Sequence, residues 1–170
     1  VRYGGEYLGR GEKDKASAIM IAAGLLEAFV SLLAFLVVAA TAGLAQRYFT
    51  ESKGVAWMFI IYAIGLLANF NVETSTGILQ VTHKIQLQGV FNLVQNVIAT
   101  LIIGAAFLWN GTLPVVLGAY LLGKFFLGLG MFIAAQIQLR KILGAGWTKV
   151  SLSILTSTRE MIRFAVSSNV

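Results

Sequence analysis

The sequence predicts an all-α, polytopic membrane protein with four transmembrane helices. Of its 170 residues, 58% are hydrophobic and only 12% are charged, and the mean hydropathy is +0.81. Soluble domains carry closer to ~25% charged residues. Four apolar segments each approach or exceed the ~20 residues that a spanning helix needs. No segment shows the strict two-residue alternation of an outer-membrane barrel, so lipid-spanning helices are the expected fold.

The predicted helices follow one another with short polar connections. Asp14 or Ser17 caps the first helix, where an acidic side chain suits the positive end. Residues 110–112 (NGT) form a tight turn, and Pro114 suits the first turn of the helix that follows. The predicted bounds are 16–45, 55–81, 85–109 and 113–139.

We divide the chain into two regions. Residues 1–142 hold an N-terminal cytoplasmic loop and the four helices, and residues 143–170 hold a cytoplasmic interfacial segment and the start of a further helix. The glycines at 144 and 146 break the last helix, and the alternation of polar and apolar residues after Trp147 is typical of a segment at the membrane interface. Thr158 is the expected cap of the further helix.

The positions of the basic residues predict the orientation. Positive charges are concentrated in cytoplasmic connections of membrane proteins. We therefore expect both ends of the chain to be cytoplasmic. The net charge of +6 lies at helix ends, which argues against a nucleic-acid-binding surface. One side holds Arg2, Arg10, Lys13, Lys15, Lys84, Arg140, Lys141, Lys149, Arg159 and Arg163, and the other holds Arg47 and Lys53.

Several function classes are disfavoured by composition. The chain has no cysteine and a single histidine, His83, so the thiolate and imidazole ligands of a zinc site are missing. No Ser/His/Asp triad or pair of catalytic carboxylates is recognisable. We expect neither an enzyme nor a bound cofactor or metal.

Two predicted helices carry polar stripes. Side chains three or four residues apart share one helix face, and a polar face in lipid would lack hydrogen-bond partners. The stripes therefore predict either a hydrated cleft open to the cytoplasm or amide hydrogen bonds between helices. The second helix contributes Tyr62, Gly65, Asn69, Glu73, Thr76 and Gln80, and the third contributes Gln88, Asn92, Gln95 or Asn96, and Thr100.

Glu27, Glu73 and Lys124 are ionisable residues inside the apolar segments. Each charge costs roughly 2.5–3.5 kcal/mol at the bilayer centre and usually marks a transport path. The Lys124 ammonium is expected to meet a carboxylate or a substrate phosphate, or to snorkel to the interface. Glu27 either binds a proton or Na⁺ or pairs with a lysine. The candidate substrate or coupling-ion residues are Lys124, Glu73, Glu27, Asn69, Tyr120, Gln88 and Asn92.

Two stretches resemble a known family. Residues 3–16 (YGGEYLGRGEKDKA) are similar to the cytoplasmic loop before the third helix of Wzx-like flippases of O-antigen and other lipid-linked oligosaccharides. Those flippases belong to the multidrug/oligosaccharidyl-lipid/polysaccharide exporter superfamily. Residues 74–88 (TSTGILQVTHKIQLQ), continued by 92–96 (NLVQN), look like the end of that family's fourth helix and the start of its fifth. The sequence departs from the family at 82–84 (THK), where an acidic–arginine pair is common.

The resemblance implies a fragment covering about helices three to six of a larger two-lobed transporter bundle. It also implies flipping of undecaprenyl-diphosphate-linked oligosaccharide across a bacterial or archaeal cytoplasmic membrane, in polysaccharide or lipopolysaccharide biosynthesis. The implied partners are the lipid-linked oligosaccharide, membrane lipids, H⁺ or Na⁺, and other polysaccharide-assembly membrane proteins. In this reading Lys124 holds the diphosphate, Glu73 and Glu27 balance charge or carry the coupling ion, and the amide stripes contact sugar hydroxyls. Two alternatives stay open: a cation-coupled multidrug exporter of the same superfamily and a four-helix membrane scaffold or assembly subunit.

Overall fold

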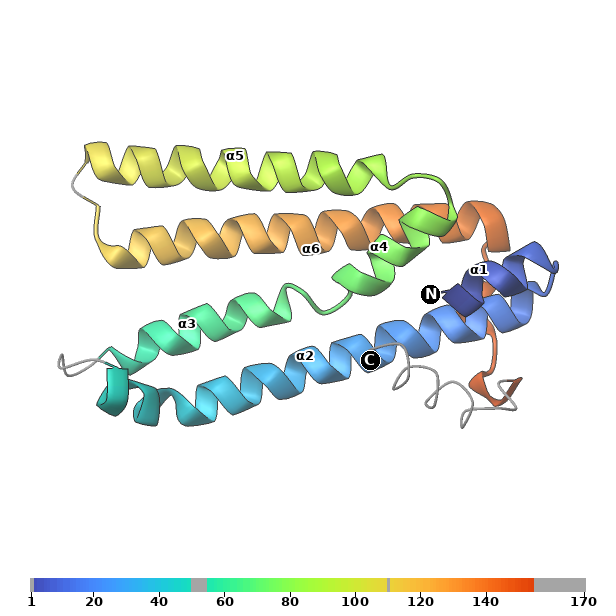
Figure 1. The fold of residues 1–170 in the computed structure, drawn as a ribbon, viewed down its shortest axis with the longest axis horizontal. Coiled ribbons are helices and arrows are strands. Elements are labelled where there is room, and N and C mark those ends of the chain that lie inside the picture. Colours follow the sequence, from blue (N-terminus) through green and yellow to red (C-terminus); the bar gives the residue numbers. More distant parts are fainter. Residues whose placement is uncertain (1, 50–54, 110, 155–170) are drawn as a thin grey trace.

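The computed structural model describes residues 2–49, 55–109 and 111–154, and these form a bundle of helices (Figure 1). Four stretches are long and apolar enough to cross a membrane, which confirms the predicted all-α fold with four candidate spans and is compatible with a multi-pass membrane protein. No β-strand occurs in the described ranges. The helices are α1 (Arg2–Gly9), α2 (Lys13–Phe49), α3 (Ala56–Leu67), α4 (Val72–Val81), α5 (Gln86–Leu108) and α6 (Leu113–Leu143), followed by the 3₁₀ turns η1 (Trp147–Lys149) and η2 (Leu152–Ile154).

The bundle is built from two hairpins joined by α4. Helices α2 and α3 run antiparallel, and so do α5 and α6 (Figure 1). Helices α3 and α4 lie between α2 and α6, and α5 packs on the outer side of α6. This order places the second predicted span at the centre of the bundle, in contact with both of its long neighbours.

The charges separate along the bundle as expected. The end that carries α1, the start of α2, the α4–α5 connection and η1 is called the basic end below (Figure 1). It holds Arg10, Lys13, Lys15, Lys84, Arg140, Lys141 and Lys149, whereas the described part of the opposite end holds Arg47. Lys53 lies outside the described residues.

The N-terminal stretch is helical, although a loop was expected. Helix α1 lies across the basic end (Figure 1), and its glycines make this close packing feasible. A Cβ at Gly4 would lie 2.9 Å from Cε of Met20, and one at Gly5 would lie 3.1 Å from a methyl of Val81. The helix therefore rests on α2 and α4 through Gly4 and Gly5.

The second predicted helix, 55–81, is not continuous. Helix α3 ends at Leu67 and α4 begins at Val72, with a turn at 68–71 that lies near the middle of the bundle's length (Figure 1). The sequence of this turn is Ala-Asn-Phe-Asn, called the hinge turn below. It contains no proline or glycine. Asparagine side chains compete with the helical backbone for hydrogen bonds, and this competition favours an interruption.

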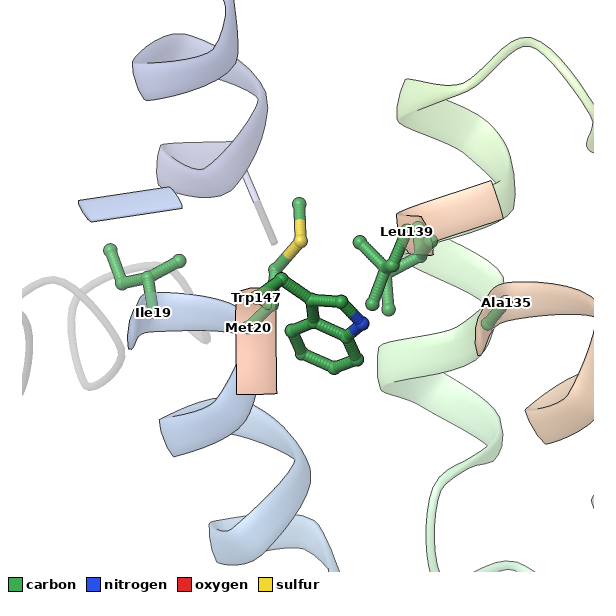
Figure 2. Close-up of a cluster of buried hydrophobic side chains, with 6 residues drawn as sticks. Ile19, Met20, Ala135, Leu139 and Trp147 are labelled. Carbon is green, nitrogen blue, oxygen red and sulfur yellow. The ribbon is translucent and has the colours of Figure 1, made fainter. Parts of the chain in front are cut away.

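The segment after α6 packs back onto the bundle. Trp147 is only 7% exposed and completes a core at the basic end (Figure 2). The predicted further helix and its cap at Thr158 lie outside the described residues. The core around the indole comprises Ile19 and Met20 of α2, Ile78 of α4, and Ala135 and Leu139 of α6.

Helix α6 contacts the hinge turn through a glycine. A Cβ built at Gly128 would overlap the carbonyl oxygen of Ala68, the residue that follows α3. The backbone of the interruption thus reaches the surface of α6 only because position 128 has no side chain. Close approach through small residues is a common way for membrane helices to pack.

This contact gives a first prediction. Gly128→Ala is expected to separate α6 from the hinge turn and to destabilise the protein by about 1–3 kcal/mol, the usual range for overpacking. Gly118→Ala is the matched control, because it lies on the same helix and a Cβ there meets nothing within 4 Å. Unfolding of the purified protein in mixed micelles with increasing SDS measures both. Equal unfolding midpoints for the two variants would contradict the close contact between Gly128 and the hinge turn.

Candidate functional site

The interruption of the second span exposes backbone donors in the middle of the bundle. The first residues of any helix have N–H groups without partners inside that helix. In lipid an unpaired N–H costs several kcal/mol. At the start of α4, Val72 N–H donates to the carbonyl of Asn69 at 3.3 Å, which leaves the amides of Glu73 and Thr74 to be paired.

Glu27 pairs both of these amides. Its Oε1 accepts from Glu73 N–H and its Oε2 accepts from Thr74 N–H, each at 2.8 Å. We call this arrangement the carboxylate cap. The cap comes from α2, a different helix, whereas the residue at the usual capping position, Asn71, makes no side-chain cap bond. A negative carboxylate also suits the positive end of the α4 dipole.

The hinge turn is held on the α2 side by close packing. Asn71 lies against Gly24, where a Cβ would come within 3.2 Å of the Asn71 Nδ2. Asn69, one of the predicted site residues, is half-buried, and its backbone N–H donates to the carbonyl of Leu66 at 3.1 Å. Together with Gly128 on α6, these contacts hold the interruption between two long helices.

The side chain of Glu73, unlike that of Glu27, takes no part in the carboxylate cap. Its backbone amide belongs to the carboxylate cap, but its side chain is exposed on the surface of the bundle. Among the described residues it forms no ion pair. The structure therefore brings Glu27 and Glu73 together through the main chain, while the Glu73 carboxylate itself stays accessible.

Lys124 belongs to a second cluster, built on α3 and α6. The rings of Tyr62 and Tyr120 stack with centroids 5.5 Å apart, and the Lys124 Nζ lies 5.8 Å from the Tyr120 ring centroid. Gly65 makes room for this stack, because a Cβ there would lie 3.0 Å from Tyr120 Cε1. We call Tyr62, Tyr120 and Lys124 the tyrosine–lysine cluster.

Of the alternatives left open for Lys124, pairing with the carboxylate of Glu27 or Glu73 does not occur among the described residues. The ion pairs within the described ranges are Arg10–Glu6 and Lys15–Glu12, both near the basic end. Lys124 instead faces an aromatic ring, a geometry that attracts an ammonium through the ring quadrupole. It lies one helical turn before Gly128, on the α6 face that contacts the hinge turn.

The sequence predicted a cleft between the second and third spans, but the pocket described below lies elsewhere in the bundle. Within α5, Asn92 donates through Nδ2 to the backbone carbonyl of Gln88 at 3.1 Å, so its amide bonds inside its own helix. Gln95 packs on α6, where a Cβ at Gly123 would lie 3.1 Å from its Cγ. Because α6 separates most of α5 from α3 and α4, the two stripes do not face one another.

A pocket of about 390 Å³ lies instead among α2, α4, α6 and η1. It begins at the hinge turn with Phe70 and Asn71 and reaches Trp147 at the basic end. Its walls are mostly apolar, and Thr74 and Ser75 of α4 contribute polar groups.

Sequence reasoning left the role of Glu27 open, placed Gly24 on its face as a site of close helix approach, and did not single out Asn71 or Gly128. One signal was available for the interruption: Asn71 followed by Glu73 inside an apolar segment has the form of a helix start. No sequence signal connects Glu27 to that start, because the two lie 46 residues apart.

Comparisons of this chain with protein-family models, with curated proteins and with solved structures give no match.

The carboxylate cap gives a second prediction. Glu27→Ala is expected to cost about 2 kcal/mol, because hydrogen bonds to a charged group contribute roughly 1.5–3 kcal/mol, and to speed hydrogen exchange at the amides of Glu73 and Thr74. Glu27→Gln keeps one strong acceptor, so its stability and its exchange rates should fall between those of the parent protein and those of Glu27→Ala. Glu73→Gln is the matched control, since it removes an accessible carboxylate from the same helix start. Exchange measured residue by residue would contradict the cap if all three variants matched the parent protein.

Proposed function

We propose that this chain is part of a membrane transporter that flips undecaprenyl-diphosphate-linked oligosaccharide by alternating access. The observation that carries this proposal is the interrupted second span, whose α4 amides are paired by Glu27 from a neighbouring helix. Interrupted membrane helices with polar groups at their broken ends are typical of substrate and ion sites in secondary transporters. The family resemblance of residues 3–16 and 74–88 supplies the substrate class.

In the proposed mechanism Lys124 contacts the diphosphate. Its ammonium has no carboxylate partner among the described residues, so it offers a positive charge to an anion. The stacked rings of Tyr62 and Tyr120 form an apolar and aromatic platform beside it. Desolvated ammonium groups bind phosphate oxygens as point charges. The amide side chains on neighbouring turns would contact sugar hydroxyls.

The hinge turn supplies the proposed movement. Because α3 and α4 are joined by a turn at 68–71 and not by continuous helix, each can tilt separately. Glu27 holds α4 to α2 in the present arrangement. Binding of a proton or Na⁺ would change the charge of the Glu27 carboxylate and so alter the hydrogen bonds that hold α4 to α2. Glu73 provides a second carboxylate at the same helix start. No covalent chemistry is required.

The accessible Glu73 carboxylate also favours the second candidate, a cation-coupled multidrug exporter. A negative side chain near mid-membrane can bind a cationic drug directly. The two candidates differ in what competes for transport. A lipid-linked oligosaccharide analogue inhibits a flippase, and a lipophilic cation inhibits the exporter.

A third prediction tests Lys124. Lys124→Ala in the full-length protein is expected to lower flipping in reconstituted vesicles about tenfold or more, because charge-assisted hydrogen bonds contribute roughly 1.5–3 kcal/mol. Lys124→Glu should lower it further by repelling phosphate. Lys84→Ala, in the connection at the basic end, is the control and should leave flipping unchanged. Undiminished transport in both Lys124 variants would rule out a phosphate role for this side chain.

A fourth prediction tests the hinge turn. The chain has no native cysteine, and a Cβ at Gly24 would lie 3.7 Å from the Asn71 Cγ. The Sγ of a cysteine at position 71 would lie close to the position of that Cγ, so side chains at 24 and 71 contact one another and the pair Gly24→Cys and Asn71→Cys tests a crosslink; a disulfide forms where the two Cβ atoms come about 3.5–4.5 Å apart. Oxidation should stop transport, and a reductant should restore it. Each single cysteine variant is a control for the oxidant. Full transport by the crosslinked protein would show that this contact stays closed throughout the cycle.

A further inference from the structure

Helix α5 lies at the edge of the bundle and has one long exposed face (Figure 1). It packs mainly on α6, and in the described part of the chain no helix lies on its opposite side. The centre of this face is a line of residues spaced alternately by three and four, which is the repeat along which two helices pair in a left-handed crossing. These residues, all exposed, are called the α5 seam: Gln86, Gly89, Leu93, Asn96, Thr100 and Ile103.

The spacing belongs to any helix face, but the composition of the α5 seam is distinctive. The exposed face of α2 consists of large apolar side chains, as contact with lipid favours, and it includes Leu25, Leu26, Phe29, Val30, Leu33 and Leu36. Four of the six seam positions are instead glycine or an uncharged polar residue. Small and polar residues are enriched where membrane helices contact one another. The seam therefore resembles a helix–helix contact and not a lipid-facing surface.

Two polar side chains of the seam lack partners. Asn96 lies near the middle of α5, and neither its amide nor the Thr100 hydroxyl makes a hydrogen bond to another described residue. Thr41, which is exposed on α2, instead donates its hydroxyl to the carbonyl of Val37 at 2.8 Å. Because hydrocarbon offers no hydrogen bonds, an unpaired amide at this depth is unfavourable. The Asn96 amide therefore requires a partner from outside the described bundle.

Two glycines on the exposed face of α5 allow another helix to come close. A Cβ built at Gly89 or at Gly104 meets nothing within 4 Å, so neither glycine makes room for a neighbour inside the bundle. The two positions lie on either side of Asn96 along the helix. A helix that packs on the seam can thus approach the α5 backbone above and below the amide.

We propose that the α5 seam binds the α5 seam of a second copy of this chain, with the two Asn96 amides hydrogen-bonded to one another. Copies of one chain share the membrane orientation that their basic residues set, so their α5 helices run parallel and their Asn96 side chains lie at the same depth. An amide carries both donors and an acceptor, so it is complementary to an identical amide across a twofold axis. Helix α5 has no charged side chain, so the two helices do not repel one another. The inference goes beyond the proposed transport activity and does not depend on it.

Disulfide trapping tests the contact, because the chain has no native cysteine. Leu93→Cys and Thr100→Cys are introduced one at a time into the full chain, which is placed in phosphatidylcholine vesicles and oxidised. Both variants are expected to give covalent dimers, since seam residues near a twofold axis meet their own copies. Leu26→Cys on α2 is the matched control for random collision, because Leu26 is 63% exposed and Leu93 is 65% exposed. It should stay monomeric.

Energy transfer between copies measures the strength of association. Donor and acceptor dyes are attached to Ser151→Cys, an exposed position at the basic end, and the protein is diluted with lipid. Asn96→Ala is expected to raise the dissociation constant about tenfold, the size of effect that a polar contact between membrane helices has in model peptides. Asn96→Gln keeps the amide and should restore most of the affinity. Asn92→Ala is the matched control, since that amide already bonds inside its own helix.

Two outcomes would overturn the inference. Energy transfer that only rises in proportion to protein density, with no more crosslinking at Leu93→Cys than at Leu26→Cys, would show that the seam faces lipid or other helices of the same protein. An equal dissociation constant for Asn96→Ala and the parent chain would show that the amide has no part in the contact. Neither outcome bears on the transport measured for the Lys124 variants.

Discussion

The rest of this structure depends on how the backbone donors of an interrupted membrane helix are paired. Lipid offers no hydrogen bonds, so a helix can break at mid-membrane only where protein replaces the missing partners. Here both oxygens of Glu27 accept from the amides of Glu73 and Thr74 at 2.8 Å. The half-buried Glu27 carboxylate and the interrupted helix therefore stabilise one another. The carboxylate gains two donors and a helix dipole, and α4 gains its cap.

Small residues let the neighbouring helices reach this interruption. Gly24 admits Asn71 on one side, and Gly128 admits the carbonyl of Ala68 on the other. A side chain at position 128 would push α6 away from the turn, whereas one at position 24 would displace only the Asn71 amide by a few tenths of an ångström. Gly65 serves the adjacent tyrosine–lysine cluster in the same way, by leaving space for Tyr120. The polar features of the bundle are thus grouped around α3 and α4, the two short helices at its centre (Figure 1).

The separation of charges gives the bundle two chemically distinct polar regions. Glu27 is occupied by backbone amides, whereas Lys124 lies beside an aromatic ring without a carboxylate partner in the described ranges. The region around Glu27 holds α4 to α2 through hydrogen bonds that depend on the charge of the carboxylate. The region around Lys124 is suited to bind an anion. The pocket at the basic end forms a third region with no lining charge, where the hydroxyl of Ser75 is the buried polar group without a partner. The difference between the first two regions is the physical basis for proposing a headgroup site at the tyrosine–lysine cluster.

The sequence by itself determined the membrane class, the number of long apolar spans and the separation of basic residues toward one end, because each follows from local composition. Residues four apart share a helix face, so the spacing of Tyr120 and Lys124 is itself enough to explain their contact. The sequence did not reveal the break at 68–71, the helical state of residues 2–9 or the burial of Trp147. It was wrong about which polar stripes face one another. Only the tertiary structure decided these features, because the partner of α4's amides lies 46 residues away and the glycines act through contacts with other helices.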